Sequence, residues 1–331
     1  GYGVTFLPNN RTFAGHYTTD LQKRGIEVIY SPWIPSLQKF FSERGQEFDF
    51  IMVSRHYIAA QYIRLIRKYC PQAKFIFDTV DLHYLREERQ AELENSLPLQ
   101  RAAAQTKRSE LGIINAADAT LVVSPVEKTV LAEAAPDARV HVISNVHKVV
   151  GSRKPFAERK DMLFVGSYQH PPNIDAAHWF VKEIWPLIRA EIPDVQFHLI
   201  GSKATESVRA LHGNGVLFHG FVERLEPWLD DCRLAVAPLR YGAGIKGKVN
   251  ISMIRGQPVV ATPCAVEGMF AEPGRDILVA ESAEDFAREV VRLYRDEELW
   301  NLVSASGLEN VNRYFSVETA RLGLHELLKS L

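Results

Sequence analysis

One stretch of this sequence, residues 234–268, constrains the fold more than any other. It opens with the apolar run Leu234 to Pro238, which is typical of a buried parallel strand. A glycine-rich loop follows, and we expect a helix from there to Arg255, ended by Gly256. A second apolar strand is expected at Pro258 to Ala261. The stretch therefore predicts a strand, a turn, a helix and a further strand in succession, as in a parallel α/β sheet.

The loop in this stretch has the composition of an anion site, because glycines let the backbone approach a phosphate and lysines supply positive charge. The residues concerned are Gly242, Gly244, Lys246, Gly247 and Lys248. They follow neither the Gly-Lys-Ser/Thr order nor the Gly-x-Gly-x-x-Gly fingerprint. The late position of the loop, in the second half of an α/β sequence, suggests a nucleoside diphosphate held by a C-terminal domain. Without an anion, the lysines would be solvated side chains near a helix start.

Length and composition describe a globular chain with room for two domains. The 331 residues include 46% hydrophobic and 24% charged ones, and the net charge of -1 gives no sign of a nucleic-acid partner. No apolar run reaches the roughly 18 residues that a membrane helix needs. Cys70, Cys232 and Cys264 are dispersed in apolar contexts. We expect buried free thiols rather than metal ligands or a disulfide, and a cytoplasmic protein.

Short β-rich runs alternate with helical patterns along the whole chain, which is the signature of doubly wound parallel sheets. The polar segment Val149 to Lys160 is the best candidate for an interdomain linker. One helix is expected over Ile174 to Glu191, and the tail from Ala283 is expected to be helical with breaks at Gly307 and Phe315. The expected divisions are an N-terminal domain over 1–150, a nucleotide-binding domain over 151–315, and a C-terminal helix over 316–331 that packs back toward the first domain.

Ligands of open α/β sheets bind outside the carboxyl ends of the strands, so polar residues that follow predicted strands are candidates for a site. In the first half, Asp78, Asp81 and His83 follow the strand expected at Lys74 to Phe77. Two carboxylates and an imidazole in one strand-end segment favour a place in the active cleft. The alternative is helix capping by Asp81 and a structural His83.

Other strand-end residues extend this face. Arg55 and His56 follow the strand expected at Asp49 to Val53 and are candidates for the acceptor side of the cleft; otherwise they are ordinary loop residues. Glu110 is a candidate of the same kind, against the alternative of a solvated acid on a helix. In the second half, Gly166 and Ser167 follow the strand expected from Met162. Two such faces, opposed across a linker, make a cleft.

Taken together, these motifs resemble glycosyltransferase family 4, the retaining, metal-independent nucleotide-sugar enzymes of GT-B fold. The resemblance covers nearly the whole chain. In the first half it rests on DTVDLH at 78–83, ADATLVVS at 117–124 and VISN at 142–145. In the second half it rests on LFVGS at 163–167, PPN at 171–173, VQFHLIG at 195–201, VLFHGFV at 216–222, GAGIKGKV at 242–249, GQPVVAT at 256–262 and EGM at 267–269.

The resemblance implies two Rossmann-like domains facing a cleft and a glycosyltransferase of the hexosyltransferase type. The donor would be a nucleoside-diphosphate sugar, bound without a metal or other cofactor because lysines neutralise the leaving diphosphate. The donor-binding residues would be Gly166, Ser167, Gly244, Lys246 and Lys248, and the catalytic groups would be Asp78, Asp81 and His83.

The resemblance also implies an acceptor and a setting. The acceptor would be a glycan or a lipid-linked glycan, in bacterial surface polysaccharide synthesis such as that of O-antigen or capsule. The basic residues Arg101, Lys107 and Arg108 are a candidate for peripheral contact with the inner membrane, unless they form a solvated helix face.

Three features depart from the family pattern. Members often carry two glutamates around the glycine-rich loop, where this chain has Ala243 and Ile251, and neither side chain accepts a hydrogen bond. Glu267 is the candidate substitute for donor binding; otherwise it is an exposed loop acid. The family's first strand would precede Gly1, so we expect the first strand–helix unit to be missing, in a fragment or in part of a larger multidomain protein.

Two other functions stay open from the sequence. A degenerate domain that has lost both acids would serve as a binding or scaffold module of a larger protein. Nucleotide-sugar 2-epimerases share the architecture and need carboxylate pairs, for which Asp78 and Asp81 are candidates.

Overall fold

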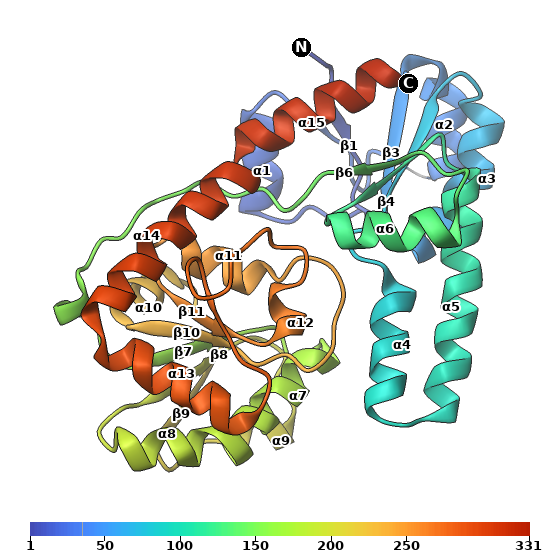
Figure 1. The fold of residues 1–331 in the computed structure, drawn as a ribbon. Coiled ribbons are helices and arrows are strands. Elements are labelled where there is room, and N and C mark those ends of the chain that lie inside the picture. The colour runs from blue at the N-terminus through green and yellow to red at the C-terminus, as the bar shows by residue number, and fades with distance from the viewer. Residues whose placement is uncertain (35) are drawn as a thin grey trace.

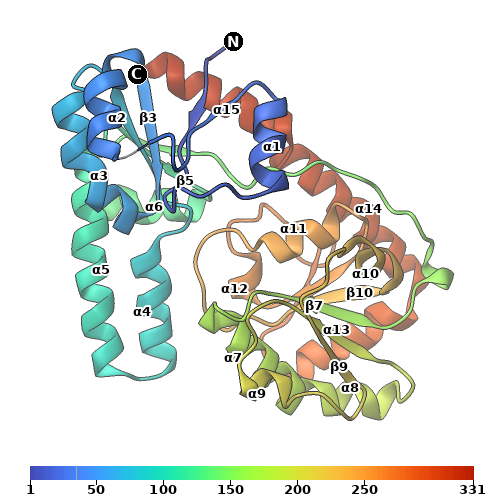
Figure 2. The same cartoon turned by 180° about the vertical axis from the view of Figure 1, so that it is seen from behind.

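The computed structural model describes residues 1–34 and 36–331 and has two α/β domains, between which the chain crosses twice (Figures 1 and 2). The first crossing follows the last strand of the first domain. The second leads into the final helix, which returns to the first domain. Among the described residues, no helix combines the length and the apolar character required to cross a membrane.

The first domain is built on four parallel strands in the order β3-β4-β5-β6. Their bounds are Phe50–Ser54, Lys74–Asp78, Ala119–Val122 and Val140–Val142. A separate parallel pair, β1 (Thr5–Phe6) and β2 (Glu27–Val28), is connected by α1 (His16–Lys23), so the chain opens with a strand–helix–strand unit. The other helices are α2 (Leu37–Arg44), η1 (Gly45–Glu47), α3 (His56–Tyr69), α4 (His83–Leu93), α5 (Leu97–Ala116) and α6 (Pro125–Ala134).

Helices α4 and α5 form a hairpin that extends from the first domain along the second (Figures 1 and 2). Pro98 stands in the first turn of α5, where its missing N–H costs nothing. The buried residues of α5 include Ala103, Ile113 and Ile114, at spacings that keep them on one side of a helix. The hairpin therefore brings residues of the first domain, at positions 83–93, close to the second.

The second domain contains a six-stranded parallel sheet in the order β12-β11-β10-β7-β8-β9. The strands are β7 (Met162–Val165), β8 (Phe197–Ile200), β9 (Val216–Gly220), β10 (Leu234–Ala237), β11 (Val259–Ala261) and β12 (Leu278–Val279). The helices are η2 (Phe156–Glu158), α7 (Pro171–Trp179), η3 (Phe180–Ile184), α8 (Trp185–Glu191), α9 (Glu206–Arg209), α10 (Glu226–Asp231), α11 (Gly247–Met253), α12 (Pro263–Val266) and α13 (Ala283–Arg295).

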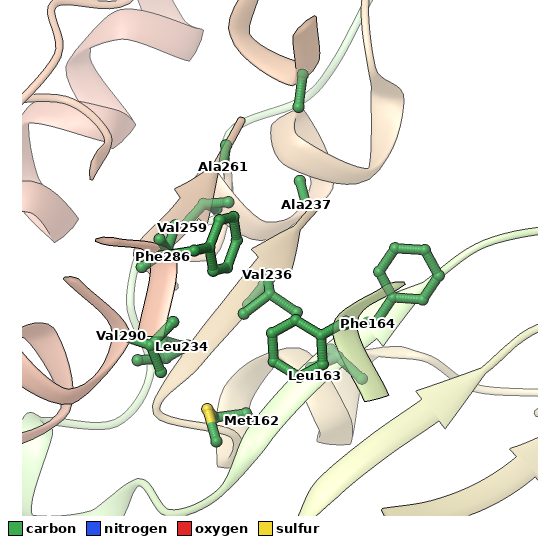
Figure 3. Packing of buried hydrophobic residues seen from close by; sticks show 14 of the residues in the cluster. Met162, Leu163, Phe164, Leu234, Val236, Ala237, Val259, Ala261, Phe286 and Val290 are labelled. Atoms are coloured by element: carbon green, nitrogen blue, oxygen red, sulfur yellow. The ribbon is translucent and has the colours of Figure 1, made fainter. Parts of the chain in front are cut away.

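The core of the second domain explains why its strands are uninterrupted apolar runs in the sequence. Phe286 and Val290 of α13 pack against Leu234 and Val259 on one face of the sheet (Figure 3). All four residues of β10 are buried, because helices cover both faces of a parallel sheet. Complete burial of a side chain such as Phe286 stabilises the fold by about 1.5–3 kcal/mol.

The segment that precedes the second sheet is held against the second domain by Arg159. This side chain is fully buried and donates hydrogen bonds to the carbonyl oxygens of Leu229 at 2.8 Å, Lys154 at 3.0 Å and Arg255 at 3.2 Å. Carbonyl dipoles thus satisfy this cation, which makes no ion pair with a carboxylate in the described part of the chain. The segment predicted as a linker is irregular apart from η2, and its second half is part of the packed domain.

The helix expected over Ile174 to Glu191 is interrupted. It consists of α7, the π-helical turn η3 and α8. Pro186 stands in the first turn of α8 and has no N–H to donate to the preceding turn, which accounts for the wider turn before it.

The C-terminal helices correct one prediction. The break expected at Gly307 is wrong, since α14 runs without interruption over Glu297–Tyr314. A Cβ on Gly307 would lie only 3.2 Å from the Asp276 carbonyl oxygen and 3.2 Å from Met253 Cε, so close packing explains the glycine. The break at Phe315 is present, and Ser316 caps the next helix, α15 (Val317–Ser330).

Helix α15 packs on the sheet of the first domain (Figure 1). Leu327 is fully buried there and packs in one cluster with Ile76, Ala119 and Leu121, which belong to β4 and β5. The last helix of the chain therefore completes the core of the first domain.

Candidate active site between the two domains

The strand order of the second sheet marks where a ligand should bind. β7 and β10 are neighbours at the centre of the sheet, and the chain continues outward from them on opposite sides. Loops that leave such a pair diverge and form a crevice at the carboxyl ends of the strands. Gly166 and Ser167 follow β7, and the glycine-rich loop follows β10. The two segments predicted to hold a donor are therefore brought together.

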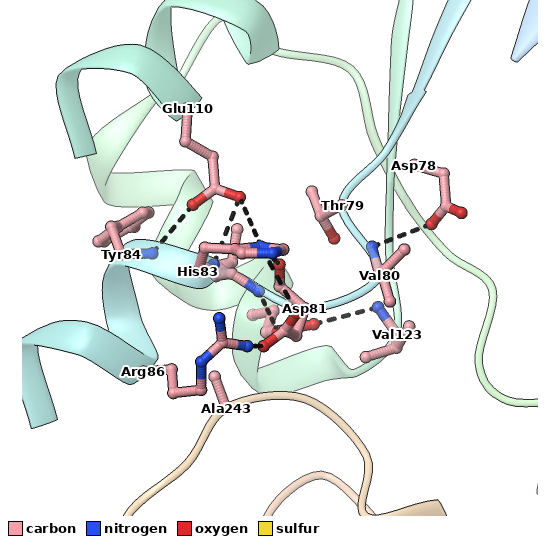
Figure 4. Close-up of polar contacts among 12 residues, drawn as sticks. Asp78, Thr79, Val80, Asp81, His83, Tyr84, Arg86, Glu110, Val123 and Ala243 are labelled. Atoms are coloured by element: carbon pink, nitrogen blue, oxygen red, sulfur yellow. Dashed lines mark hydrogen bonds and ion pairs between the residues drawn. The ribbon is translucent and has the colours of Figure 1, made fainter. Parts of the chain in front are cut away.

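The glycine-rich loop packs directly on the first domain. A Cβ on Gly244 would lie 3.0 Å from Cβ of Asp81 and 3.2 Å from Cγ2 of Val123. The φ angle of Gly244 is +64°, a conformation that favours glycine. Figure 4 shows the neighbouring Ala243 facing Asp81 and Arg86 across this contact. Candidate site residues predicted in the first and the second half of the sequence are thus in contact in the structure.

Asp78 shapes the loop between β4 and α4. Its carboxylate accepts hydrogen bonds from the hydroxyl of Ser54 at 2.7 Å and from the backbone N–H of Val80 at 3.1 Å. Val80 has a φ of +67°, which is strained for a β-branched residue. Such strain persists where the surrounding structure enforces it, and it is concentrated at functional sites. Asp78 therefore fixes the conformation of the segment that carries Asp81 and His83.

Asp81 and His83 lie together at the start of α4 (Figure 4). The guanidinium of Arg86 donates to the Asp81 carboxylate. Nδ1 of His83 lies 3.1 Å from the backbone carbonyl oxygen of Asp81, which can only accept, so Nδ1 carries the proton in this bond. Asp81 is not the N-cap of α4, because Leu82 holds that position and its apolar side chain accepts no hydrogen bond from the helix.

Two buried carboxylates, those of Glu110 and Glu127, accept hydrogen bonds from backbone N–H groups of this segment. Glu110 of α5 accepts the backbone N–H groups of His83 at 3.3 Å and Tyr84 at 3.1 Å. Glu110 is fully buried, so the alternative of a solvated helix acid is wrong. Glu127 of α6 accepts the backbone N–H groups of Leu82 at 2.9 Å and Val123 at 3.1 Å.

The role of Glu127 was not predicted from the sequence. The spacing of Ser124 and Glu127 is that of a capping box, and the Ser124 hydroxyl does accept the Glu127 N–H at 3.2 Å. That signal predicts a helix start. It does not predict that the carboxylate reaches the β4–α4 loop.

Burial sets the protonation behaviour of these groups. Burial raises the pKa of Glu127 to about 7, against the opposing effect of its two N–H donors. Burial alone would lower the pKa of His83, but the carboxylates of Glu110 and Asp81 outweigh it and raise the pKa. The pKa of the neighbouring His56 is lowered, mainly by burial.

Arg55 and His56 border the same cluster. The backbone N–H of Arg55 donates to the carbonyl of Asp78 at 2.8 Å, and its φ of +76° turns the chain from β3 into α3. The His56 ring meets the His83 ring edge-on, with centroids 4.9 Å apart. Within the part of the chain that the structure describes, the buried Nδ1 of His56 has no hydrogen-bond partner.

Lys246 is turned into its own loop. Its ammonium donates to the carbonyl oxygens of Gly244 at 2.6 Å and Ala243 at 3.2 Å, and burial lowers its pKa. In this arrangement the side chain maintains the shape of the glycine-rich loop.

Lys248 lies in the first turn of α11 and faces the β7–α7 segment. Its ammonium donates to Oδ1 of Asn173 and lies 4.2 Å from the centroid of the Phe164 ring. Burial, and to a lesser extent the neighbouring Lys246, lowers the pKa of Lys248 to about 7. Such a site favours an anion, because a negative charge would restore the proton.

Asn173 joins the two donor segments. Its Nδ2 donates to the carbonyl of Ser167 at 2.8 Å, while its Oδ1 accepts from Lys248. A Cβ on Gly166 would lie 2.9 Å from Cγ of Asn173, so glycine is needed for this approach. The Pro-Pro-Asn motif at 171–173 does not by itself indicate this role of Asn173.

Glu267 is bound to the other domain. Both of its carboxylate oxygens accept from the guanidinium of Arg89 on α4, at 2.6 and 2.8 Å. The adjacent Gly268 has a φ of +75°, and a Cβ there would lie 2.5 Å from Cβ of Ser124. No local pattern points to Arg89, because the two partners are 178 positions apart.

Among the described residues, this interface has no metal cluster, and Asp78 and Asp81 are not a free carboxylate pair. No group of three or more histidine, cysteine and acidic side chains within residues 1–34 and 36–331 is arranged to hold a metal ion. Asp78 is engaged by Ser54 and Val80, and Asp81 by Arg86. This arrangement does not favour the acid–base pair that an epimerase needs.

Comparison with known proteins identifies the fold. HepE of Anabaena, solved with UDP and glucose, aligns with a TM-score of 0.71 at 15% identity, over 99% of this chain and 100% of its own. Sucrose-phosphate synthase of Thermosynechococcus elongatus aligns with a TM-score of 0.74 at 16% identity, over 100% and 89%. The fold is GT-B. The predicted fold class is thus confirmed, and the GT-B interface is where the residues above converge.

Other matches cover parts of proteins. TarM aligns with a TM-score of 0.70 at 15% identity, over 88% of this chain and 57% of its own. Residues 159–296 match the family model described as glycosyl transferases group 1. An uncharacterized 44.6 kDa protein in the cps region of Klebsiella pneumoniae is 24% identical over 140 residues. That match spans 40% of this chain and 36% of the length of the relative.

Proposed function

We propose that this chain is a glycosyltransferase that moves a sugar from a nucleoside-diphosphate sugar to a hydroxyl group of a glycan or lipid-linked glycan. The observation that carries the proposal is the contact of the glycine-rich loop with the β4–α4 loop, at Gly244 against Asp81. This contact brings the predicted phosphate loop of one domain against polar groups of the other, and ligand sites are frequent at domain interfaces. The match of residues 159–296 to glycosyl transferases group 1 supports it.

The donor is assigned to the second domain. HepE was solved with UDP-glucose and with UDP, and TarM of S. aureus with UDP, which supports a nucleoside diphosphate as the leaving group. Gly166, Ser167 and Gly244 would present backbone to the diphosphate, and Lys248 would supply charge. With a pKa of about 7 in the empty site, Lys248 would gain a proton as the anion binds. The charge of the leaving group is then balanced without a metal.

The first domain would orient the sugar and the acceptor. In this assignment His83 and Asp81 face the transferred sugar, and Arg55 and His56 lie on the acceptor side. Nδ1–H of His83 is directed to the Asp81 carbonyl, so Nε2 is the atom left for the substrate. We propose transfer with retention of configuration and catalysis by positioning and leaving-group stabilisation, with the donor phosphate accepting the acceptor's proton.

The setting we propose is bacterial surface polysaccharide synthesis, of capsule or O-antigen type. The description of the Klebsiella relative as a protein in the cps region supports the capsule. A lipid-linked acceptor would place the enzyme in the cytoplasm, at the inner membrane.

A second candidate function, a binding or scaffold module, has one observation in its favour. Ala243 and Ile251 stand where related enzymes often carry acids, and Glu267 is engaged by Arg89. A protein of this kind would hold its partners without turning over a donor.

Calorimetric titration with UDP, GDP, ADP and dTDP tests the donor site. We expect selective binding of one nucleotide, weakened about tenfold or more in Lys248→Ala, because a charge-assisted contact is lost. Lys182→Ala, which removes an exposed lysine of the same domain, should leave the affinity unchanged. If a folded wild-type protein binds none of the four, the donor site is rejected and the scaffold function is favoured.

Turnover requires a second measurement. With the nucleotide identified, the corresponding sugar donor and a panel of glycan acceptors should yield a glycoside. The anomeric configuration of the product, read by NMR, should match that of the donor. An inverted product would reject retention, and an epimerised donor formed without any acceptor would indicate an epimerase.

A further inference from the structure

Arg89 connects the first domain to the glycine-rich loop and to Glu267, both predicted to bind the donor. Its guanidinium donates two hydrogen bonds to Glu267, at 2.6 and 2.8 Å, and a third to the carbonyl oxygen of Gly242, at 2.7 Å. Gly242 begins the glycine-rich loop, and Glu267 is the C-cap of α12, the short helix that follows β11. A cation of the first domain therefore contacts the start of the loop that is expected to hold a diphosphate.

The contact of Arg89 with Glu267 differs from a buried structural ion pair. The two side chains are 27% and 26% exposed, whereas those of the Arg255–Asp230 pair in the second domain are 10% and 12% exposed. Pairs with this much contact with water contribute little to stability, so one partner can be replaced at small cost. The Arg89–Glu267 pair is therefore open to exchange in a way that Arg255–Asp230 is not.

Three further cations near the glycine-rich loop are held by different partners. Lys246 donates to carbonyl oxygens of its own loop, and Lys248 donates to Asn173. Arg86 is paired with Asp81 inside the first domain. Arg89 instead has an anionic partner across the domain interface. A phosphate presents the same pair of oxygens to a guanidinium as a carboxylate does, and it carries more charge.

We propose that Arg89 exchanges Glu267 for the diphosphate of the donor, so that the pair seen here is the resting state of the donor site. The exchange would also release the Glu267 carboxylate, which could then accept hydrogen bonds from hydroxyl groups of the ribose or the sugar. That release supplies an acceptor in a chain with Ala243 and Ile251 at the usual acidic positions. Because Arg89 belongs to the first domain, donor binding would bridge both domains. This inference rests on the proposed function.

Inorganic pyrophosphate and UDP are the probes that test the exchange, each titrated by calorimetry. Arg89→Gln should weaken both by about tenfold or more. Glu267→Gln should bind pyrophosphate several-fold more tightly than the wild type, because Arg89 no longer has a charged partner to leave. Pyrophosphate lacks a ribose, so a lost sugar contact cannot mask this gain. Opposite signs for the two variants are the signature of exchange.

A matched control is Arg44→Gln. Arg44 makes a bidentate pair with Glu27 in the first domain, at 2.9 and 3.0 Å, away from the donor segments. It should change neither affinity. Arg89→Lys keeps the charge but loses the fork, and it should fall between the wild type and Arg89→Gln. If Arg89→Gln does not fold, Arg89→Lys takes its place as the test variant. Weaker pyrophosphate binding by Arg89→Lys than by the wild type then supports the exchange, and unchanged binding overturns it.

The remaining outcomes separate this inference from the proposed function. If the wild type binds UDP while Arg89→Gln and Glu267→Gln bind pyrophosphate as the wild type does, the pair is a structural tie and the exchange is overturned, with the donor site intact. The same holds if both variants weaken binding equally. If the folded wild type binds neither pyrophosphate nor any nucleoside diphosphate, both the proposed function and the exchange are rejected.

Discussion

Oε1 of Glu110 lies 3.6 Å from Nδ1 of His83 and also accepts the backbone N–H of the same residue at 3.3 Å. One buried carboxylate therefore fixes the position of His83 and stabilises its protonated form. Since the pKa of His83 is raised, its contribution to stability is present below the ordinary histidine pKa of 6.5 and is lost as the pH rises through the raised value.

Glu110→Gln should lower the pKa of His83, because it removes the negative charge and keeps the shape. It should also reduce the free energy of unfolding by about 1–3 kcal/mol, since one backbone N–H loses its acceptor. Titration of the histidine ring signals by NMR measures the first effect, and chemical denaturation the second. Glu92→Gln, on the exposed side of α4, is the control and should change neither. An unchanged His83 titration would show that Glu110 acts only through the backbone.

The raised pKa of Glu127 predicts a second pH dependence of stability. Here the cause is burial, which favours the neutral form of the carboxyl group. Its pKa is raised from 4.5 to about 7, so the folded protein holds this proton more tightly than the unfolded chain. Stability from this group therefore falls as the pH rises between those values, by about 3 kcal/mol in total. Glu127→Gln abolishes that slope, although it adds a constant cost because an amide accepts fewer hydrogen bonds.

The measurement is the free energy of unfolding of the wild type and of Glu127→Gln at several pH values from 4.5 to 7.5. The variant should gain stability relative to the wild type as the pH rises. Glu133→Gln, an exposed acid of the same helix, should follow the wild type. Parallel curves for the wild type and Glu127→Gln would contradict the raised pKa.

Elements whose causes are local could be predicted from the sequence. The apolar run at β10 and the glycines after it specify a strand and a turn by composition alone, and the structure has both. Gly307 misled the prediction because its cause is distant. The residue is glycine so that Asp276 and Met253 can approach α14, which no pattern within the helix reveals.

The residues of the candidate site also differ in whether local sequence patterns could reveal them. Asp81, His83 and the glycine-rich loop were found because each follows a strand and strand ends converge in an α/β sheet. Asn173 and Arg89 act through partners 75 and 178 positions away, so their roles depend on how the two segments meet in space. Glu267 was found as an acid near the loop, but its partner was not.

The lowered pKa of Lys248 predicts that the protein takes up a proton when it binds a diphosphate. Its pKa of about 7 means that most molecules have a neutral amine at pH 8, and a bound anion would restore the charge. We expect roughly 0.5–1 proton taken up per UDP at pH 8, and an affinity that falls as the pH rises above about 7. Calorimetry in buffers with different ionisation enthalpies counts the protons. Lys248→Met should abolish the uptake and Lys182→Ala should not; equal uptake in both variants would place the anion elsewhere.

Substitution of Gly244 by alanine should cause both backbone strain and a clash with the first domain, and a control glycine can separate the two effects. Gly244 and Gly274 both have positive φ, +64° and +85°, so alanine at either costs about 1–2 kcal/mol in the left-handed region. Only at Gly244 would the added methyl also meet a neighbour, at 3.0 Å from Asp81, whereas Gly274 has open space around it.

Gly244→Ala should therefore weaken UDP binding and lower transfer activity by at least tenfold, because the glycine-rich loop must move away from Asp81. Gly274→Ala should lose a similar amount of stability and keep both properties. Denaturation measures the first comparison, and calorimetry with a turnover assay measures the second. If Gly244→Ala binds UDP and turns over as Gly274→Ala does, the close approach of the loop to Asp81 is not required, and the two domains must act in an arrangement where Gly244 and Asp81 are apart.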